Sequence, residues 1–230
     1  MIIPAVLESN IEKTEQNLAL AGGFSPIVQM DITPQTPFFK IRLPKIPSLQ
    51  IESHLMLEEQ EDFAMYLKYL EHSTNFPPLQ QKNMNTTKMA KISKICLQIE
   101  NLELTKSLDF LTKVKTLGLE TGISLFCQTS PERINDYFPF VNYIQILGVN
   151  AGKQGQELIP ETLTRVQKVK MLFPHIPLQV DGGIKKENIT LLLQLGVNNV
   201  VIGSAIFNAK SPQKEYEDFV RMEKEWKTKK

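Results

Sequence analysis

Cysteine is scarce in this sequence, which holds only Cys96 and Cys127 among its 230 residues. Two thiols are too few for a disulfide framework or for a zinc site made of thiolates. We therefore expect both to be buried free thiols, as is usual in a cytoplasmic protein.

An excess of charge of either sign is also lacking. The 26 Lys and Arg residues nearly balance the 25 Asp and Glu residues, which leaves a formal net charge of +1. A chain with this balance has no electrostatic basis for binding nucleic acid or an anionic membrane surface. We therefore expect neither nucleic acid nor membrane as a partner.

Long apolar runs are absent as well. No run approaches the roughly 20 residues that span a bilayer. Residues 1–4 lack the basic and apolar stretches of a signal peptide, so we expect no such leader. Hydrophobic residues nevertheless make up 42% of the sequence and charged residues 22%, which is typical of globular chains rather than disordered ones.

Short β-rich apolar runs alternate with amphipathic runs at helical spacing, a rhythm typical of βα units and a parallel sheet. An open doubly wound sheet is the main alternative. No G-x-G-x-x-G pattern follows the first strand, however, which weakens a dinucleotide-binding interpretation. We therefore predict an α/β fold, a single (β/α)8 barrel domain over residues 1–230. The expected strands cover residues 2–7, 27–32, 49–56, 92–99, 123–127, 143–149, 178–181 and 199–202.

Two stretches interrupt this rhythm. Residues 33–47 contain several prolines and cannot form a long helix. Residues 73–90 are polar and include a Pro-Pro pair, which predicts a long loop. The expected helices cover residues 11–21, 58–72, 107–117, 160–173, 187–195 and 212–227, and another begins near Ser130.

Polar residues recur at the carboxyl ends of the predicted strands, where barrel enzymes keep their reactive groups. They are Asp31, His54, Glu100, Asn150 and Asp181. Glycine-bearing turns follow the last three strands. Glycine permits a close backbone approach, and N–H groups at a helix start can hold a phosphate. Together these features predict a phosphorylated small molecule as the ligand.

Six stretches of the sequence carry a family resemblance. They are IIPAVL (2–7), VQMDI (28–32), ESHLML (52–57), GVNAGKQGQELIPETL (148–163), LQVDGGIKKENI (178–189) and GVNNVVIGSAIF (196–207). In this order, and over nearly the whole chain, they resemble the ribulose-phosphate 3-epimerase family. The resemblance implies a (β/α)8 TIM barrel of the ribulose-phosphate-binding type. It also implies an isomerase of the pentose phosphate pathway that interconverts D-ribulose 5-phosphate and D-xylulose 5-phosphate.

Epimerisation beside a ketone removes a proton from one face of a carbon and returns one to the other face. It therefore needs two acid/base groups and stabilisation of an enediolate oxygen. The resemblance implies that Asp31 and Asp181 are the proton-transfer pair. It also implies a divalent metal ion (Zn, Fe, Mn or Co) held by Asp31, His54 and Asp181. Gln29 stands in the place of the fourth ligand, and no organic cofactor is implied.

The sugar phosphate would be bound by the turns after the last three strands. The resemblance assigns this role to Gly152, Gly155, Gly182, Gly183, Gly203 and Ser204. It further implies a phosphorylated sugar as the substrate and an assembly of identical subunits.

The sequence also departs from the family pattern. Ala5 replaces a serine, Gln29 and Gln98 each replace a histidine, and Leu147 replaces a methionine; further departures are Lys153-Gln154 and residues 32–36. A Gln amide oxygen is a poorer zinc or iron ligand than imidazole. Three interpretations stay open. The chain could be an epimerase with a weakened or different metal, an epimerase-like enzyme that stabilises the enediolate without metal through Lys153 or Gln29 as donors, or a catalytically impaired sugar-phosphate-binding barrel. An aldolase- or decarboxylase-type reaction is a further alternative.

Each candidate side chain also has a purely structural explanation. Asp181 precedes Gly-Gly and could cap the turn, Asp31 could be a surface acid, and His54 could be a satisfied core residue. The surrounding resemblance favours a functional role for both aspartates. For His54 the two explanations carry about equal weight.

Overall fold

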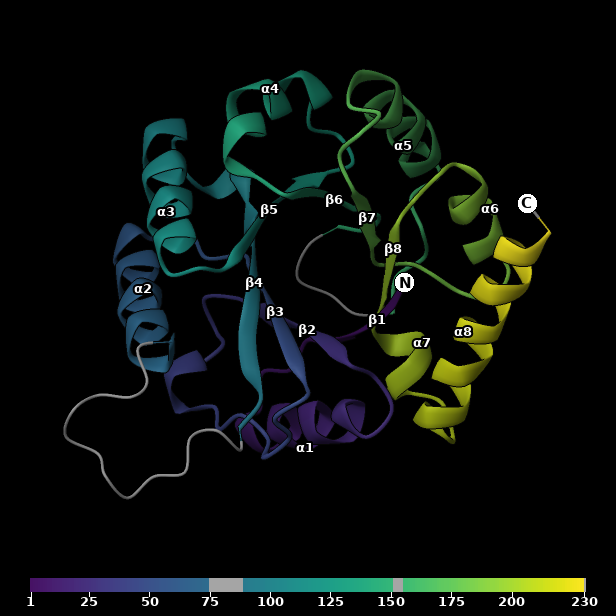
Figure 1. Ribbon diagram of the computed structural model, residues 1–230, viewed down its shortest axis with the longest axis horizontal. Coiled ribbons are helices and arrows are strands. Elements are labelled where there is room, and N and C mark those ends of the chain that lie inside the picture. The colour runs from purple at the N-terminus through teal and green to yellow at the C-terminus, as the bar shows by residue number, and fades with distance from the viewer. Residues whose placement is uncertain (75–88, 151–154, 230) are drawn as a thin grey trace. The chain divides into compact units, whose positions relative to one another are not determined.

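The computed structural model describes residues 1–74, 89–150 and 155–229. Eight parallel strands follow one another around the sheet in sequence order and close into a barrel (Figure 1). The predicted (β/α)8 fold class is therefore confirmed. The strands are β1 (Ile2–Val6), β2 (Ile27–Ile32), β3 (Gln50–Leu55), β4 (Lys91–Gln98), β5 (Glu120–Phe126), β6 (Tyr143–Leu147), β7 (Leu178–Asp181) and β8 (Asn199–Ile202).

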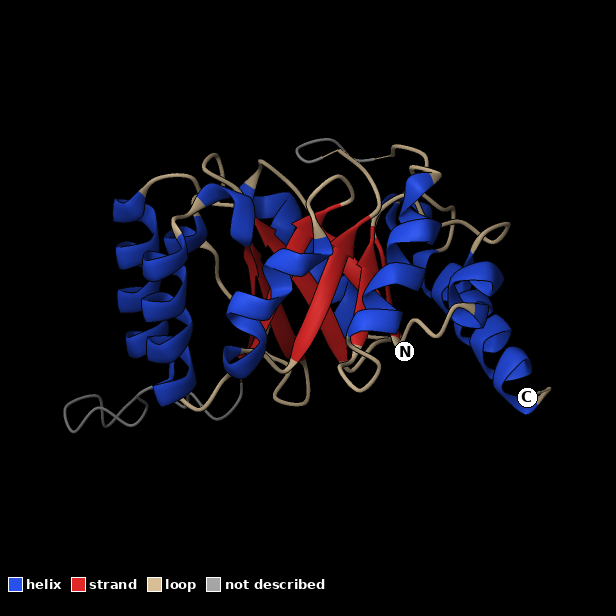
Figure 2. Cartoon of the chain, turned by 90° about the horizontal axis from the view of Figure 1, so that it is seen from above, coloured by secondary structure: helices blue, strands red, loops and turns tan. Residues whose placement is uncertain are grey.

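Helices separate the strands along the chain, and Figure 2 shows them in blue against the red strands. The helix predicted near Ser130 is a short α4 between 3-10 turns, and the short α7 after β8 is absent from the sequence prediction. The helices are α1 (Ile11–Gly22), α2 (Gln60–Thr74), α3 (Leu104–Thr116), α4 (Ile134–Tyr137), α5 (Glu161–Leu172), α6 (Ile189–Gln194), α7 (Ser204–Phe207) and α8 (Pro212–Thr228); 3-10 turns cover η1 (Phe38–Lys40), η3 (Ile99–Asn101), η4 (Pro131–Arg133) and η5 (Phe138–Phe140).

Contacts divide the chain into two compact units, residues 6–121 and residues 1–5 with 122–230. A single domain over residues 1–230 stays a prediction. The loop predicted for residues 73–90 lies mostly outside the described residues. Among the helices of the described segments, none combines the length and the hydrophobicity that crossing a bilayer requires.

The unit of residues 6–121 holds β2, β3 and β4 with helices α1, α2 and α3. The Asn10 side chain caps α1 by accepting the Lys13 N–H at 3.0 Å. Phe63 of α2 and Phe110 of α3 meet edge to face with ring centroids 5.4 Å apart, so these helices share an aromatic core. The strand register places Asp31 opposite His54.

The unit of residues 1–5 and 122–230 holds most of β5, all of β6, β7 and β8, and the start of β1, which pairs with β8. Ser211 caps α8, where Pro212 suits the first helical position because no N–H is needed there. The buried Tyr216 and Phe219 anchor this helix. The register places Asp181 opposite Leu147 on one side and Val201 on the other.

The strand interiors are largely apolar, as expected for a parallel sheet buried on both faces. Several polar side chains are nevertheless buried among them: Gln29, Asp31, His54, Gln98, Gln145, Gln179 and Asp181. Because alternate residues of a strand share a face, Gln29 lies on the same side as Asp31, and Gln179 on the same side as Asp181. Buried polar groups need hydrogen-bond partners, and these partners define the candidate site.

Candidate active site

Asp31 and His54 form the first part of the site, near the carboxyl ends of β2 and β3. His54 Nδ1 lies 3.3 Å from Asp31 Oδ1. The His54 side chain is fully buried and Asp31 is only 8% exposed. Because water is nearly excluded, the interaction between these two groups is stronger than on a surface.

Gln29 contacts the same carboxylate oxygen. Its Nε2 donates to Asp31 Oδ1 at 2.8 Å, and its side chain is fully buried. An amide N–H group has no lone pair for a metal ion, whereas it stabilises a carboxylate. In this arrangement Gln29 supports Asp31 as a donor; its roles as the fourth metal ligand and as a donor to the enediolate stay predictions.

His54 is held from its other side by β4. Its Nε2 lies 3.1 Å from Gln98 Oε1, and Gln98 Nε2 in turn donates to Glu100 Oε2. Glu100, predicted at a strand end, lies in η3 and is half-buried. His54, Gln98 and Glu100 therefore form one row of hydrogen-bonded side chains.

Asp181 ends β7 and receives its own carboxamide donor. Gln145 Nε2 donates to Asp181 Oδ2 at 3.3 Å and to Ser124 Oγ at 3.4 Å. Gln145 Oε1 accepts from Gln179 Nε2 at 2.7 Å, and Gln179 Oε1 accepts from Asn199 Nδ2 at 3.2 Å. Asn199, Gln179 and Gln145 thus form a chain of hydrogen-bonded side-chain amides, here called the amide ladder. Each NH2 group donates to the next residue, and the last one donates to Asp181.

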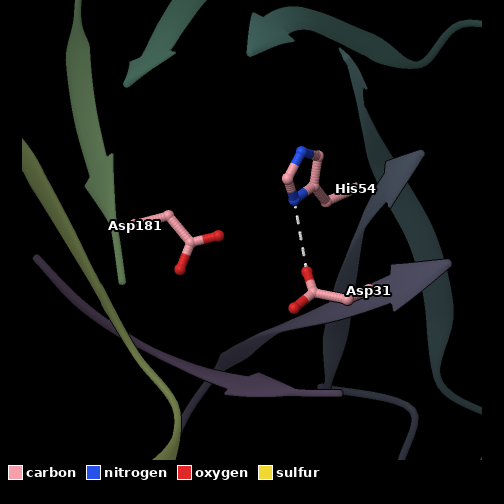
Figure 3. Close-up of side chains that lie close together, drawn as sticks. All are labelled: Asp31, His54 and Asp181. Carbon is pink, nitrogen blue, oxygen red and sulfur yellow. Dashed lines mark ion pairs between the residues drawn. The ribbon is translucent and has the colours of Figure 1, made fainter. Parts of the chain in front are cut away.

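Asp31, His54 and Asp181 each offer one ligand atom within 4.8 Å of the other two (Figure 3). All three residues are buried. One imidazole nitrogen and two carboxylate oxygens suit a divalent metal ion such as Zn, Fe, Mn or Co. The donor set therefore fits the predicted metal.

Two of the predicted phosphate-binding glycines, Gly182 and Gly183, lie at a turn that glycine occupies more easily than other residues. Gly182 and Gly183 have φ of +93° and +72°, and a Cβ on Gly183 would lie 2.4 Å from the backbone N of Leu158. Gly203 and Ser204 begin the short α7. Since β7 and β8 are paired, both turns leave the sheet at the same end.

The turn after β6 is only partly described. Gly155 is exposed and has φ of +76°, with space around its Cα. Gly152, together with Lys153 and Gln154, lies outside the described residues. The proposed donor role of Lys153 therefore stays a prediction.

The segment that follows β2 replaces the turn expected from the resemblance. Thr33 N–H donates to Thr36 Oγ1 at 3.0 Å, and Phe38 packs edge to face on Tyr66 at 4.9 Å. Residues 33–39, with Leu57, Asp62 and Met65, line a cavity of about 250 Å³. Aromatic packing thus fixes the chain that leaves Asp31.

Two further departures are buried apolar residues. Ala5 of β1 is 4% exposed and Leu147 of β6 is 3% exposed. Leu147 is the register partner of Asp181, so an apolar side chain stands on the strand beside that carboxylate. Neither residue can donate a hydrogen bond or ligate a metal through its side chain.

Gln145 and Gln179 are the site residues that the sequence analysis missed. A signal was present, because Gln-x-Asp occurs at residues 29–31 and again at 179–181. The period of two places each Gln on the same strand face as its Asp. Only the cross-strand register reveals that Gln145, on the neighbouring strand, donates to Asp181.

Comparison with known families gives a match to the model described as the ribulose-phosphate 3 epimerase family, over residues 78–207. A ribulose-phosphate 3-epimerase of Aquifex aeolicus is 29% identical over 171 residues, which are 72% of this chain and 67% of that protein. The enzyme of the same name from Helicobacter pylori is 38% identical over 104 residues, which are 44% of this chain and 48% of that protein. The chain thus spans from about half to two thirds of these relatives.

Solved structures share the fold at low sequence identity. The KGPDC structure from Streptococcus mutans aligns with a TM-score of 0.70 at 10% identity and covers 97% of both chains. A 3-hexulose-6-phosphate synthase from Salmonella typhimurium aligns with a TM-score of 0.67 at 15% identity, covering 98% of this chain and 99% of that one. At this identity the likeness establishes the barrel fold alone.

Proposed function

Because the chain belongs to the ribulose-phosphate 3-epimerase family, we propose that it epimerises a ketopentose 5-phosphate at C3, interconverting D-ribulose 5-phosphate and D-xylulose 5-phosphate. The observation that carries the proposal is the cluster of Asp31, His54 and Asp181 in a chain of this family. The reaction needs two acid/base groups, and this cluster contains two carboxylates.

In the proposed reaction one aspartate takes the C3 proton. The electrons of the broken C–H bond form the C2–C3 double bond, and the carbonyl oxygen at C2 becomes the enediolate oxygen. The other aspartate, which starts protonated, gives its proton to the opposite face of C3 as the C2 carbonyl re-forms; this inverts the stereocentre and leaves the first aspartate protonated. Gln29 and Gln145 each donate an N–H to one of these carboxylates, which supports the proposal because a fixed carboxylate is a better-placed base.

Asp31, His54 and Asp181 would hold the divalent metal ion. When bound, such an ion supplies a positive charge that stabilises the developing enediolate. The phosphate would be bound by backbone N–H groups of the turns at Gly182 and Gly183 and at Gly203 and Ser204. Gly152 and Gly155, which follow β6 in the sequence, complete the proposed set. The same end of β7 and β8 carries Asp181 and these turns, which supports this assignment.

Conversion of D-ribulose 5-phosphate by the purified chain tests the proposal. A coupled assay should detect D-xylulose 5-phosphate, and Asp181→Asn should lower the rate about 10²- to 10⁴-fold because one acid/base group is lost. Asp136→Asn, the same change at an exposed acid of α4, is the matched control and should keep the wild-type rate. Equal rates for wild type and Asp181→Asn would end the claim of two-aspartate catalysis.

A sugar-phosphate-binding barrel without turnover is the second candidate. The observation that favours it is the amide nitrogen of Gln29, which faces Asp31 where a fourth ligand is expected. Calorimetry together with the conversion assay separates the epimerase from the binding-only barrel. The binding-only barrel requires that wild type and Asp181→Asn bind D-ribulose 5-phosphate equally and that neither converts it. An aldolase or decarboxylase reaction would instead appear as a product that is not a pentose phosphate.

A further inference from the structure

We propose that Gln98 and Glu100 are positioning residues that hold His54 in the tautomer with its proton on Nε2, so that Nδ1 is the nitrogen presented to Asp31. The inference deepens the proposed function, because it names the atom through which His54 would ligate a metal ion. It stands on hydrogen bonds within β3, β4 and η3.

The direction of the row follows from its last member. A carboxylate only accepts hydrogen bonds, so the Gln98 group that faces Glu100 is the NH2 group. The opposite end of the same amide, Oε1, then faces His54 Nε2 at 3.1 Å and can only accept. His54 Nε2 must therefore carry a proton. A neutral imidazole carries one N–H, which leaves the lone pair on Nδ1.

The Nδ1 side of the ring also meets an acceptor oxygen, so a neutral ring with this tautomer leaves room for a cation there. His54 Nδ1 lies 3.3 Å from Asp31 Oδ1, and that oxygen already accepts the Gln29 N–H at 2.8 Å. A lone pair beside a carboxylate is an arrangement that a shared cation stabilises. A ligating histidine commonly donates its other N–H to an oxygen acceptor, which fixes the ring and its tautomer.

The surroundings keep the row in place. Gln98 is 1% exposed, so water competes little for its amide. Glu100 lies in η3 beside Asn101, whose Nδ2 donates to the Leu57 backbone oxygen at 3.2 Å. This bond attaches η3 to the chain just after β3, the strand that carries His54. The acceptor end of the row is therefore fixed relative to the histidine.

Nitrogen-15 NMR of the metal-free chain, recorded at a pH at which the His54 ring is neutral, reads the tautomer directly. The sequence has three histidines, and the spectrum of His54→Gln identifies the signals of His54 by their loss. In the wild type we expect a pyrrole-type signal for Nε2 and a pyridine-type signal for Nδ1. Gln98→Leu should give a mixture of tautomers, and Glu100→Gln should shift the signals in the same direction.

Two variants separate orientation from packing. Gln98→Glu keeps an acceptor beside Nε2 and should restore the wild-type tautomer. Gln50→Leu makes the same chemical change at the exposed start of β3 and should leave the His54 signals unchanged. Zn²⁺ titration is a second readout, in which Gln98→Leu should weaken binding about 10- to 100-fold relative to Gln50→Leu.

A protonated Nδ1 in the wild type would overturn the inference, and so would an unchanged tautomer in both Gln98→Leu and Glu100→Gln. Unfolding midpoints would show whether the variants are folded. If Gln98→Leu does not fold, Glu100→Gln provides the test of the tautomer. If the wild type has the expected tautomer but binds no Zn²⁺, the metal site of the proposed function fails while the orienting role stands.

Discussion

Replacing Gln145 with leucine tests whether the amide ladder beneath Asp181 stabilises the fold. Gln145 is fully buried, and its side chain is hydrogen-bonded to Gln179 at 2.7 Å, Asp181 at 3.3 Å and Ser124 at 3.4 Å. Leucine has a similar volume, so the change removes these bonds without opening a large cavity. The stability change therefore reports mainly on hydrogen bonding.

The short bond decides the magnitude. A buried donor that loses its acceptor costs about 1–3 kcal/mol, and Gln179 Nε2 is in that position. The two bonds beyond 3.2 Å are weaker and add less. The apolar surface that leucine buries offsets part of the loss. We expect the free energy of unfolding to fall by about 2 kcal/mol.

Urea denaturation followed by circular dichroism measures this difference. The matched control is Gln194→Leu, the same change at an exposed position of α6, which should alter stability by less than about 0.5 kcal/mol. If Gln145→Leu is as stable as the control, the reasoning is refuted. The hydrogen bonds of Gln145 would then stabilise the fold no more than the apolar contacts of leucine do.

Two further predictions concern a turn and a surface ion pair. Gly183→Ala should lower the free energy of unfolding by more than Gly155→Ala in the same urea assay; both positions have positive φ, but only a Cβ on Gly183 meets backbone, 2.4 Å from Leu158 N. Equal losses of stability would contradict this prediction, because they would show that the turn at Gly183 shifts to accommodate the Cβ. Lys168, 2.8 Å away, lowers the pKa of the exposed Glu132 from 4.5 to about 2. The pair's stabilisation is therefore present above pH 4.5 and lost as pH falls toward 2. An NMR titration should return the Glu132 pKa toward 4.5 in Lys168→Ala or high salt, and identical titrations in wild type and variant would contradict this origin.

The sequence predicts the barrel because short apolar runs recur along the chain, but it places some strand ends less well: β5, expected at residues 123–127, is Glu120–Phe126. The bounds of β7 and β8, residues 178–181 and 199–202, agree with the structure, since a proline or a glycine stands beside them. The four-residue α7 is missed, because a helix of one turn has no periodicity to detect. The strand ends and the resemblance predict Asp31, His54 and Asp181 as a group, and these three residues do lie together.

The hydrogen-bond directions were not predictable from the sequence. Period-two alternation shows that Gln29 and Gln179 face the same way as the aspartates that follow them. It does not show that Gln29 donates to its own aspartate, whereas Gln179 donates to Gln145. That difference depends on cross-strand register and on which end of each amide meets a carboxylate. A carboxamide has a donor end and an acceptor end, and a sequence records neither orientation.

The carboxamides show how the site tolerates its departures from the family. Gln29 and Gln98 stand where the resemblance expects histidines, and each donates an N–H to a carboxylate, of Asp31 and of Glu100. Imidazole can also donate from one nitrogen, so these replacements can keep a donor toward the acid while they remove a strong metal ligand at residue 29. Gln145 gives Asp181 the same kind of donor. The arrangement is therefore compatible with the proposed function, with both aspartates in place and a weaker metal site at residue 29.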